Sequence, residues 1–352
     1  MITEPIAAAR ELAGRGPRGM WWVAWRQHRL AVLVSLSAAA VLAGAYLIFG
    51  LTFRSALATA DLTPQFCEDQ WGSSYDGCAG AWARVTGYGT AWAVLRVPML
   101  VLPVLVGVLV GATVVGADRE RGTQVFALTQ SVGRTRWYLT KCLVAGGPPV
   151  LALLAVGLLG RWAGDAGQLV FSWMAVPDFQ TAGITPAAFA LLAFGLAVPA
   201  GVFLRSTIAA VALSATVAAV LVVGIGYTIY TDLVPHDRIV YAADRTGWMP
   251  MTDGSLYLDD GFLDAEGNTD AGHGLSCSLY GPGTAPGDRP DSDQVDALWQ
   301  QCLDRAGIVA RYTDYLDPGR GGLLMLVVGA ICAVLAAAGL TLGWMRVRRR
   351  VL

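Results

Sequence analysis

Residues 97–117 read VPMLVLPVLVGVLVGATVVGA, a run without one Asp, Glu, Lys, Arg or His. The hydrocarbon core of a bilayer is about 30 Å thick, and a helix rising 1.5 Å per residue crosses it in about 20 residues. Five further runs have the same character, at 30–53, 142–160, 186–204, 206–230 and 321–345. Hydrophobic residues make up 55% of the chain and charged residues only 14%. We therefore predict an all-α membrane protein with six transmembrane helices.

The segments between these spans differ in charge. Lys and Arg exceed Asp and Glu by 3 in residues 1–29, by 3 in 118–141 and by 4 in 346–352. Residues 231–320 instead carry a net charge of −10. Cytoplasmic loops of membrane proteins are enriched in Lys and Arg, so both termini and the 118–141 loop are predicted to be cytoplasmic. The acidic segment is predicted to lie outside.

This topology divides the chain into four parts. The first is an amphipathic connecting helix, in which Trp21, Trp22 and Trp25 lie close to Arg26 and Arg29, as expected for a segment along the inner leaflet. A second part holds spans one to five with the 118–141 loop, a third is an extracellular domain, and the last is span six with its basic tail. Their boundaries are 1–29, 30–230, 231–320 and 321–352.

Cysteine positions agree with an oxidising outer side. Four cysteines fall in predicted outer loops: Cys67, Cys78, Cys277 and Cys302. Disulfides form and persist in oxidising compartments, so we predict a disulfide-stapled outer insertion between spans five and six. Pairing within each loop is the simplest arrangement, and cross-loop pairing stays open. Cys142 and Cys332 lie in or beside spans and are predicted to be free and buried.

The composition of the spans excludes several function classes. Ion-coupled carriers hold protons or ions on ionisable side chains at membrane depth, and these spans contain none. A P-loop requires Lys followed by Ser or Thr, but the only lysine, Lys141, precedes Cys142. No catalytic, cofactor-binding or metal-ligating residues are predicted. Active transport would therefore need an external source of energy.

Two features of the outer segment suggest local structure. Apolar residues at helical spacing predict a helix over Ser292 to Ala310. Asp259, Asp260, Asp264 and Glu266 form an acidic group without the spacing of a calcium loop. We interpret that group as a solvated acidic cap.

The 118–141 loop has the pattern of a protein contact. Val125, Phe126 and Leu128 follow Thr123, a plausible N-cap, and together they indicate a short amphipathic helix. An apolar helix face on a loop suits docking into a groove on another protein. The alternative is a basic loop whose charge serves only the topology.

The run Glu120-Arg-Gly-Thr123, then Leu128-Thr-Gln-Ser-Val-Gly-Arg134, then Arg136-Trp137 and Lys141, resembles the first cytoplasmic loop of type-2 ATP-binding-cassette (ABC) exporter permeases, particularly actinobacterial ones. Trp25-Arg-Gln-His-Arg29 before the first span is similar to the same group. Six spans, cytoplasmic termini and a large loop between spans five and six agree with that family's layout. The long 231–320 insertion departs from its simpler members.

The resemblance implies that residues 119–134 form a coupling helix that contacts a separate ABC ATPase subunit. That subunit would bind ATP and Mg²⁺, so the chain itself would not be an enzyme. A second permease chain would complete the channel as a homodimer or heterodimer, in contact with membrane lipid and with no nucleic acid. The implied function is export of a hydrophobic or amphipathic substrate across a bacterial cell membrane. The implied ATPase contacts are Glu120, Gly122, Thr123, Gln130, Ser131 and Arg134.

Two other classes remain open from the residues. A membrane sensor or immunity protein would bind a ligand through the outer domain and signal through the same loop. A membrane-embedded enzyme would need converging polar groups at a span end, and residues 118–121 are the only dense cluster of that kind.

Overall fold

The computed structural model describes residues 16–60, 75–120, 133–165, 177–204, 206–228, 235–243, 255–269 and 292–349. The side chains of 16–18, 60, 75–86, 228, 292–295 and 318 are left out of the description. The chain forms two compact units, one of Met1–Thr228 with Leu323–Leu352 and one of Ile229–Gly322.

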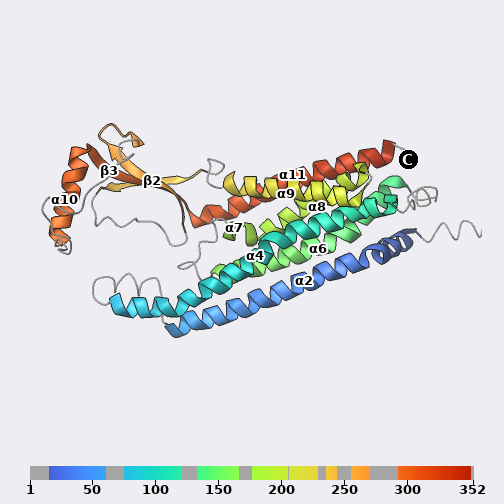
Figure 1. The fold of residues 1–352 in the computed structure, drawn as a ribbon, viewed down its shortest axis with the longest axis horizontal. Helices are drawn as coiled ribbons and strands as arrows, with labels where there is room; N and C mark the ends of the chain where they lie inside the picture. The colour runs from blue at the N-terminus through green and yellow to red at the C-terminus, as the bar shows by residue number, and fades with distance from the viewer. Residues whose placement is uncertain are drawn as a thin grey trace, which may run out of the picture. The chain divides into compact units, whose positions relative to one another are not determined.

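Six helices in the described part of the chain are long and apolar enough to span a membrane (Figure 1). This finding confirms the predicted six-helix membrane protein. A four-residue helix, α7, lies between the third and fourth of them in the sequence. The helices of the first unit are α2 (Gly16–Ala60), α4 (Tyr75–Glu120), α6 (Arg134–Asp165), α7 (Asp178–Thr181), α8 (Thr185–Phe203), α9 (Thr207–Thr228) and α11 (Pro318–Arg349).

Two helices are much longer than the predicted spans. α2 has 45 residues and α4 has 46, so each is about 67 Å long at 1.5 Å per residue. That length is more than twice the thickness of a hydrocarbon core. The predicted connecting segment is helical from Gly16 and continues into the first span without a break.

The helix α8 is the centre of the first unit. Within its most apolar stretch, 78% of the residues are buried inside the chain. Its neighbours approach closely through glycines. A Cβ atom on Gly107 of α4 would lie 2.4 Å from the backbone oxygen of Ala190, and one on Gly339 of α11 would lie 2.2 Å from that of Gly195. Small residues allow such backbone contact between helices in lipid. α8 is thus packed between α4 and α11.

The start of α2 and the end of α11 lie at the same end of this helix bundle, which we call the basal end. Met20, near the start of α2, packs against the apolar cluster that contains Trp137 of α6 and Val347 of α11. Helices α4 and α8 end there, and α6 and α9 begin there. At the opposite end, α7 lies among the helices with all four side chains buried.

The second unit contains a three-stranded antiparallel sheet, which sequence analysis did not predict. Its strands are β1 (Asp237–Ala242), β2 (Leu256–Asp264) and β3 (Ile308–Leu316), in the order β1-β3-β2. The helix α10 spans Ser292–Arg305, so the predicted helix over 292–310 is wrong for its last five residues. Gly307, with φ of +70°, ends the helical turn, and Ile308 begins β3.

Two residues of the acidic group on β2 pair with β3. Asp260 forms a 2.5 Å ion pair with Arg311, and Asp259 accepts a 3.2 Å hydrogen bond from the Tyr312 hydroxyl. These carboxylates therefore join strands as well as facing solvent. No cluster of three metal-ligating side chains occurs in the described residues.

Candidate functional site

The predicted coupling loop connects α4 to α6 at the basal end. Of the six predicted ATPase contacts, Gly122, Thr123, Gln130 and Ser131 lie outside the described residues. Glu120 is the last residue of α4, and Arg134 is the first of α6. The structure therefore describes how the loop is held at its two ends.

A buried ion pair joins those ends. Lys141 of α6 donates to Asp118 Oδ2 of α4, and their side chains are only 3% and 13% exposed. The lysine Nζ also lies 4.7 Å from the centroid of the Trp137 ring. Lys141 is the sole lysine in the chain. Separating the two side chains would leave each buried charge without its partner, which is costly. We therefore expect the pair to keep α4 and α6 close together at the ends of the loop.

His28 of α2 completes a group that we call the basal cluster, formed by His28, Asp118 and Lys141. The histidine is 7% exposed and lies near both charged partners. Its Nε2 atom is buried and has no hydrogen-bond partner among the described residues. The basal cluster thus joins three helices, including the segment that sequence analysis identified as connecting.

The end of α4 is also tied to α8 and α9. Arg119 donates to the backbone oxygens of Val202 at 2.6 Å and Leu204 at 3.2 Å, at the end of α8. Glu120 Oε1 accepts a 2.6 Å hydrogen bond from the backbone N–H of Thr207, the first residue of α9. A carboxylate at this position satisfies a free N–H and complements the helix dipole. Glu120, predicted as an ATPase contact, therefore also caps a neighbouring helix.

The start of α6 is tied to α11. Arg134 donates to the backbone oxygen of Arg348 at 3.2 Å, and the Trp344 indole donates to Thr135 Oγ1 at 3.1 Å. One turn further, the Tyr138 hydroxyl donates to the backbone oxygen of Leu340 at 2.9 Å. The two ends of the loop are thus tied by hydrogen bonds to α8, α9 and α11.

The basal cluster was missed in the sequence because each member was interpreted alone. Asp118 was considered only within the polar group 118–121 and the basic loop, and Lys141 only in the family motif and in the argument against a P-loop. The structure shows that both side chains are buried in protein. The sequence did contain a signal for this pair. Asp118 and Lys141 have opposite charges, and each lies one residue beyond an apolar span, at opposite ends of the same loop.

A second buried polar group, at the opposite end, we call the outer cluster: Trp92, Arg96 and Asp178. The carboxylate of Asp178 accepts hydrogen bonds from Trp92 Nε1 at 2.8 Å and from Arg96 Nη1 at 3.0 Å. Gln180 Nε2 donates to the backbone oxygen of Val222 in α9 at 3.3 Å. These bonds hold α7 between α4 and α9.

The two cysteines that were predicted to be free agree with the structure. Cys142 and Cys332 are free and buried, as predicted. Cys302 is disulfide-bonded, to a partner outside the described side chains. Cys67 and Cys277 lie outside the described residues, as does the side chain of Cys78, so the pairing stays a prediction.

Fold and site together define a multi-pass helical membrane protein in which the residues at the ends of the loop between the second and third spans are hydrogen-bonded to α8, α9 and α11. A family model described as "ABC-2 membrane transporter related" matches residues 36–230, more than half of the chain, and the chain belongs to this family. It is thus a membrane permease component, and such permeases generally work with an ATPase subunit. No curated protein and no solved structure matches the chain.

Proposed function

We propose that this chain is the membrane subunit of a bacterial ABC exporter, with its basal end in the cytoplasm and its 118–141 loop seated on a separate ATPase. The observation that carries the proposal is the anchoring of both loop ends: Asp118 with Lys141, Arg119 with the end of α8, and Arg134 with the end of α11. A force applied to a loop held in this way reaches the helices directly. Family membership supports the same role.

The substrate is proposed to be hydrophobic or amphipathic and to move outward. The central helix α8 is apolar, and its polar residues lie only near its beginning. A path formed by such helices disfavours strongly charged solutes, because a charge at membrane depth costs several kcal/mol.

The functional unit is proposed to be a dimer of permease chains, identical or different. Along α9, Ala210, Ser214 and Ala218 are buried against the chain's own helices. The other side of α9 exposes large apolar residues, among them Ile208 (82%) and Val220 (66%). In a permease of two chains, such a surface is available to lipid or to the second chain.

The proposed outer segment contains the second unit, with its sheet and the disulfide of Cys302. Within it, the pairing Cys277–Cys302 is proposed, and Cys67–Cys78 is proposed for the connection between α2 and α4. Mass spectrometry of unreduced peptides tests both pairings. A Cys67–Cys302 peptide would contradict them.

The decisive experiment is affinity purification of the tagged full chain from its native membrane in mild detergent. We expect a stoichiometric ATP-hydrolysing subunit to copurify. Replacing residues 122–131 by a Gly-Ser segment of equal length should abolish copurification while the chain still elutes as a folded species. The matched control is a Gly-Ser replacement of residues 281–287, which should retain the ATPase.

Two results would contradict the proposal. One is retention of the ATPase by the variant with the replaced 122–131 loop. The other is a stable wild-type chain that carries no ATPase under conditions that keep other ABC transporters intact, which would favour the sensor or immunity function.

A further inference from the structure

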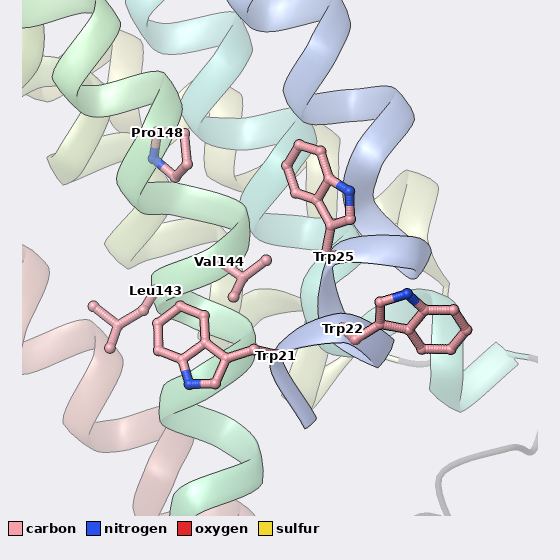
Figure 2. A pocket seen from close by; sticks show the side chains of 6 residues that line it. All are labelled: Trp21, Trp22, Trp25, Leu143, Val144 and Pro148. Atoms are coloured by element: carbon pink, nitrogen blue, oxygen red, sulfur yellow. The ribbon is translucent and has the colours of Figure 1, made fainter. Parts of the chain in front are cut away.

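A groove lies between the first turns of α2 and the first half of α6. It is lined by Trp21, Trp22 and Trp25 from α2 and by Leu143, Val144 and Pro148 from α6 (Figure 2). Its volume of about 370 Å³ falls within the range of about 300–1,000 Å³ that is usual for small-molecule sites. All six lining side chains are apolar or aromatic, so an occupant must present hydrocarbon to them.

The groove stays open in this chain. Trp21 is 47% exposed, Trp22 58% and Leu143 58%. Gly147, between the lining residues Val144 and Pro148, leaves nothing within 4 Å of the position that a Cβ would take. Large aromatic side chains exposed together around an opening indicate a binding surface more strongly than scattered exposed residues do.

Cationic side chains surround this apolar surface. The Arg26 guanidinium carbon lies 5.3 Å from the centroid of the Trp22 ring, so a positive charge sits directly at the groove. Arg26 forms no ion pair with a carboxylate among the described residues. Arg29 and Arg136 are also exposed, one turn along α2 and two turns before Leu143 on α6. An apolar groove with the Arg26 guanidinium beside it suits an amphiphile with an anionic headgroup.

The groove lies toward the basal end of the helix bundle, which the proposed topology places at the inner membrane interface. Met20, next to Trp21, packs against the basal apolar cluster with Trp137 and Val347. Tryptophans favour the headgroup level, and clustered arginines next to a span attract anionic lipid.

We propose that this groove binds one acyl chain of an anionic phospholipid, whose phosphate contacts Arg26. A second copy of the chain is a poorer occupant. A two-fold interface brings the same patch of both chains together, and here that would place Arg26 of one chain near Arg26 of the other.

The test uses the full chain, purified and delipidated in detergent, and measures fluorescence quenching by brominated phospholipids. The fluorescence of a variant with Trp21→Phe, Trp22→Phe and Trp25→Phe is subtracted from that of the wild-type chain. The difference is the fluorescence of the groove tryptophans. We expect brominated phosphatidylglycerol to quench this fluorescence at about fivefold lower lipid fraction than brominated phosphatidylcholine with the same chains, since one arginine near a membrane surface contributes about 1 kcal/mol toward anionic lipid.

Arg26→Gln should remove that preference and leave quenching by phosphatidylcholine unchanged. Arg349→Gln, a change in the basic end of α11 at a residue that does not line the groove, serves as the matched control and should retain the preference. Equal quenching by the two lipids in the wild-type chain would overturn the proposal, as would an unchanged preference in Arg26→Gln. Cross-linking of Trp22→Cys chains to each other at high yield in bilayers would show that a second copy occupies the groove, and would overturn it too. None of these readouts requires an ATPase, so the result is independent of the proposed transport function.

Discussion

The helix α4 contributes to a buried polar cluster at each end of the helix bundle, and the two clusters differ in how completely their polar groups are hydrogen-bonded. In the outer cluster, Asp178 receives hydrogen bonds from two donors, and its cationic partner Arg96 is 25% exposed. In the basal cluster, Lys141 is 3% exposed, and His28 contributes a buried nitrogen without a hydrogen-bond partner in the described residues. A buried polar network that is only partly satisfied is costly. From this difference we infer that the outer cluster is a structural anchor. The basal cluster keeps an unfavourable free energy in this arrangement, as expected of a region that changes its conformation.

The largest effect is expected from breaking the basal pair on one side. Lys141→Met leaves the Asp118 carboxylate buried without its cation, and removing one partner of such a pair costs about 3–5 kcal/mol. Thermal unfolding of the purified chain in detergent measures the loss. The double variant Asp118→Leu with Lys141→Met should recover most of the stability, since neither charge then remains buried.

The double variant also separates stability from function. If the basal cluster transmits loop movement, the recovered chain should still bind its ATPase but transport poorly. Full transport by the double variant would reduce the cluster to a structural element like the outer one.

A smaller effect is expected at the outer cluster. Asp178→Asn keeps the size of the side chain and an acceptor for Trp92, but it removes the charge that faces Arg96. The arginine is partly exposed and can reach solvent, so we expect a loss of about 1–3 kcal/mol in the free energy of unfolding. ATPase stimulation by substrate should be unaffected once the variant is folded. If Asp178→Asn loses as much ATPase stimulation as the basal-cluster variants do, the distinction between the two clusters is wrong.

The capping contact next to the basal cluster is expected to contribute less. Glu120→Ala removes the acceptor for the Thr207 N–H at the start of α9, and loss of a helix N-cap costs about 0.5–2 kcal/mol. Glu120→Gln retains an acceptor oxygen and should lose only the charge–dipole part, about 0.3–1 kcal/mol. If Glu120 contacts the ATPase as well, both variants should weaken copurification by more than their stability explains.

The smallest effect concerns an ion pair in the second unit. Arg238 donates two 2.7 Å hydrogen bonds to Asp314, and these hold the pKa of that carboxyl below its usual range. A lowered folded-state pKa adds stability above the ordinary Asp pKa of about 3.9, and this stability is lost as the pH falls through the folded value. Because Arg238 is 44% exposed, we expect less than about 1 kcal/mol.

Hydrogen exchange of the β3 amides, corrected for its intrinsic pH dependence, should show this loss of protection as the pH falls from 6 to 3. Asp314→Asn should flatten the dependence. An equally steep dependence in the variant would assign it to other carboxylates.

The number and order of the spans could be predicted from the sequence, because a bilayer imposes length and apolarity on any helix that crosses it. The predicted 186–204 and 206–230 agree closely with α8 and α9. The sheet of the second unit could not be predicted in the same way. Ile308 and Val309 continue the apolar spacing of the preceding helix, and only Gly307 marks the change to a strand.

The candidate site, too, could be predicted only in part. Loop 118–141 could be located from its charge, its motif and its place between two spans, which are local properties of the chain. The partners of its end residues could not, because they depend on which faces of the helices meet. A span that is apolar on all sides, such as α8, carries no periodic signal of its orientation. Lys141 meets Asp118, and Glu120 meets Thr207, in a bundle where Gly107 and Gly111 let α4 pack directly on the backbone of α8. Close packing of whole helices, which no single segment encodes, decides those contacts.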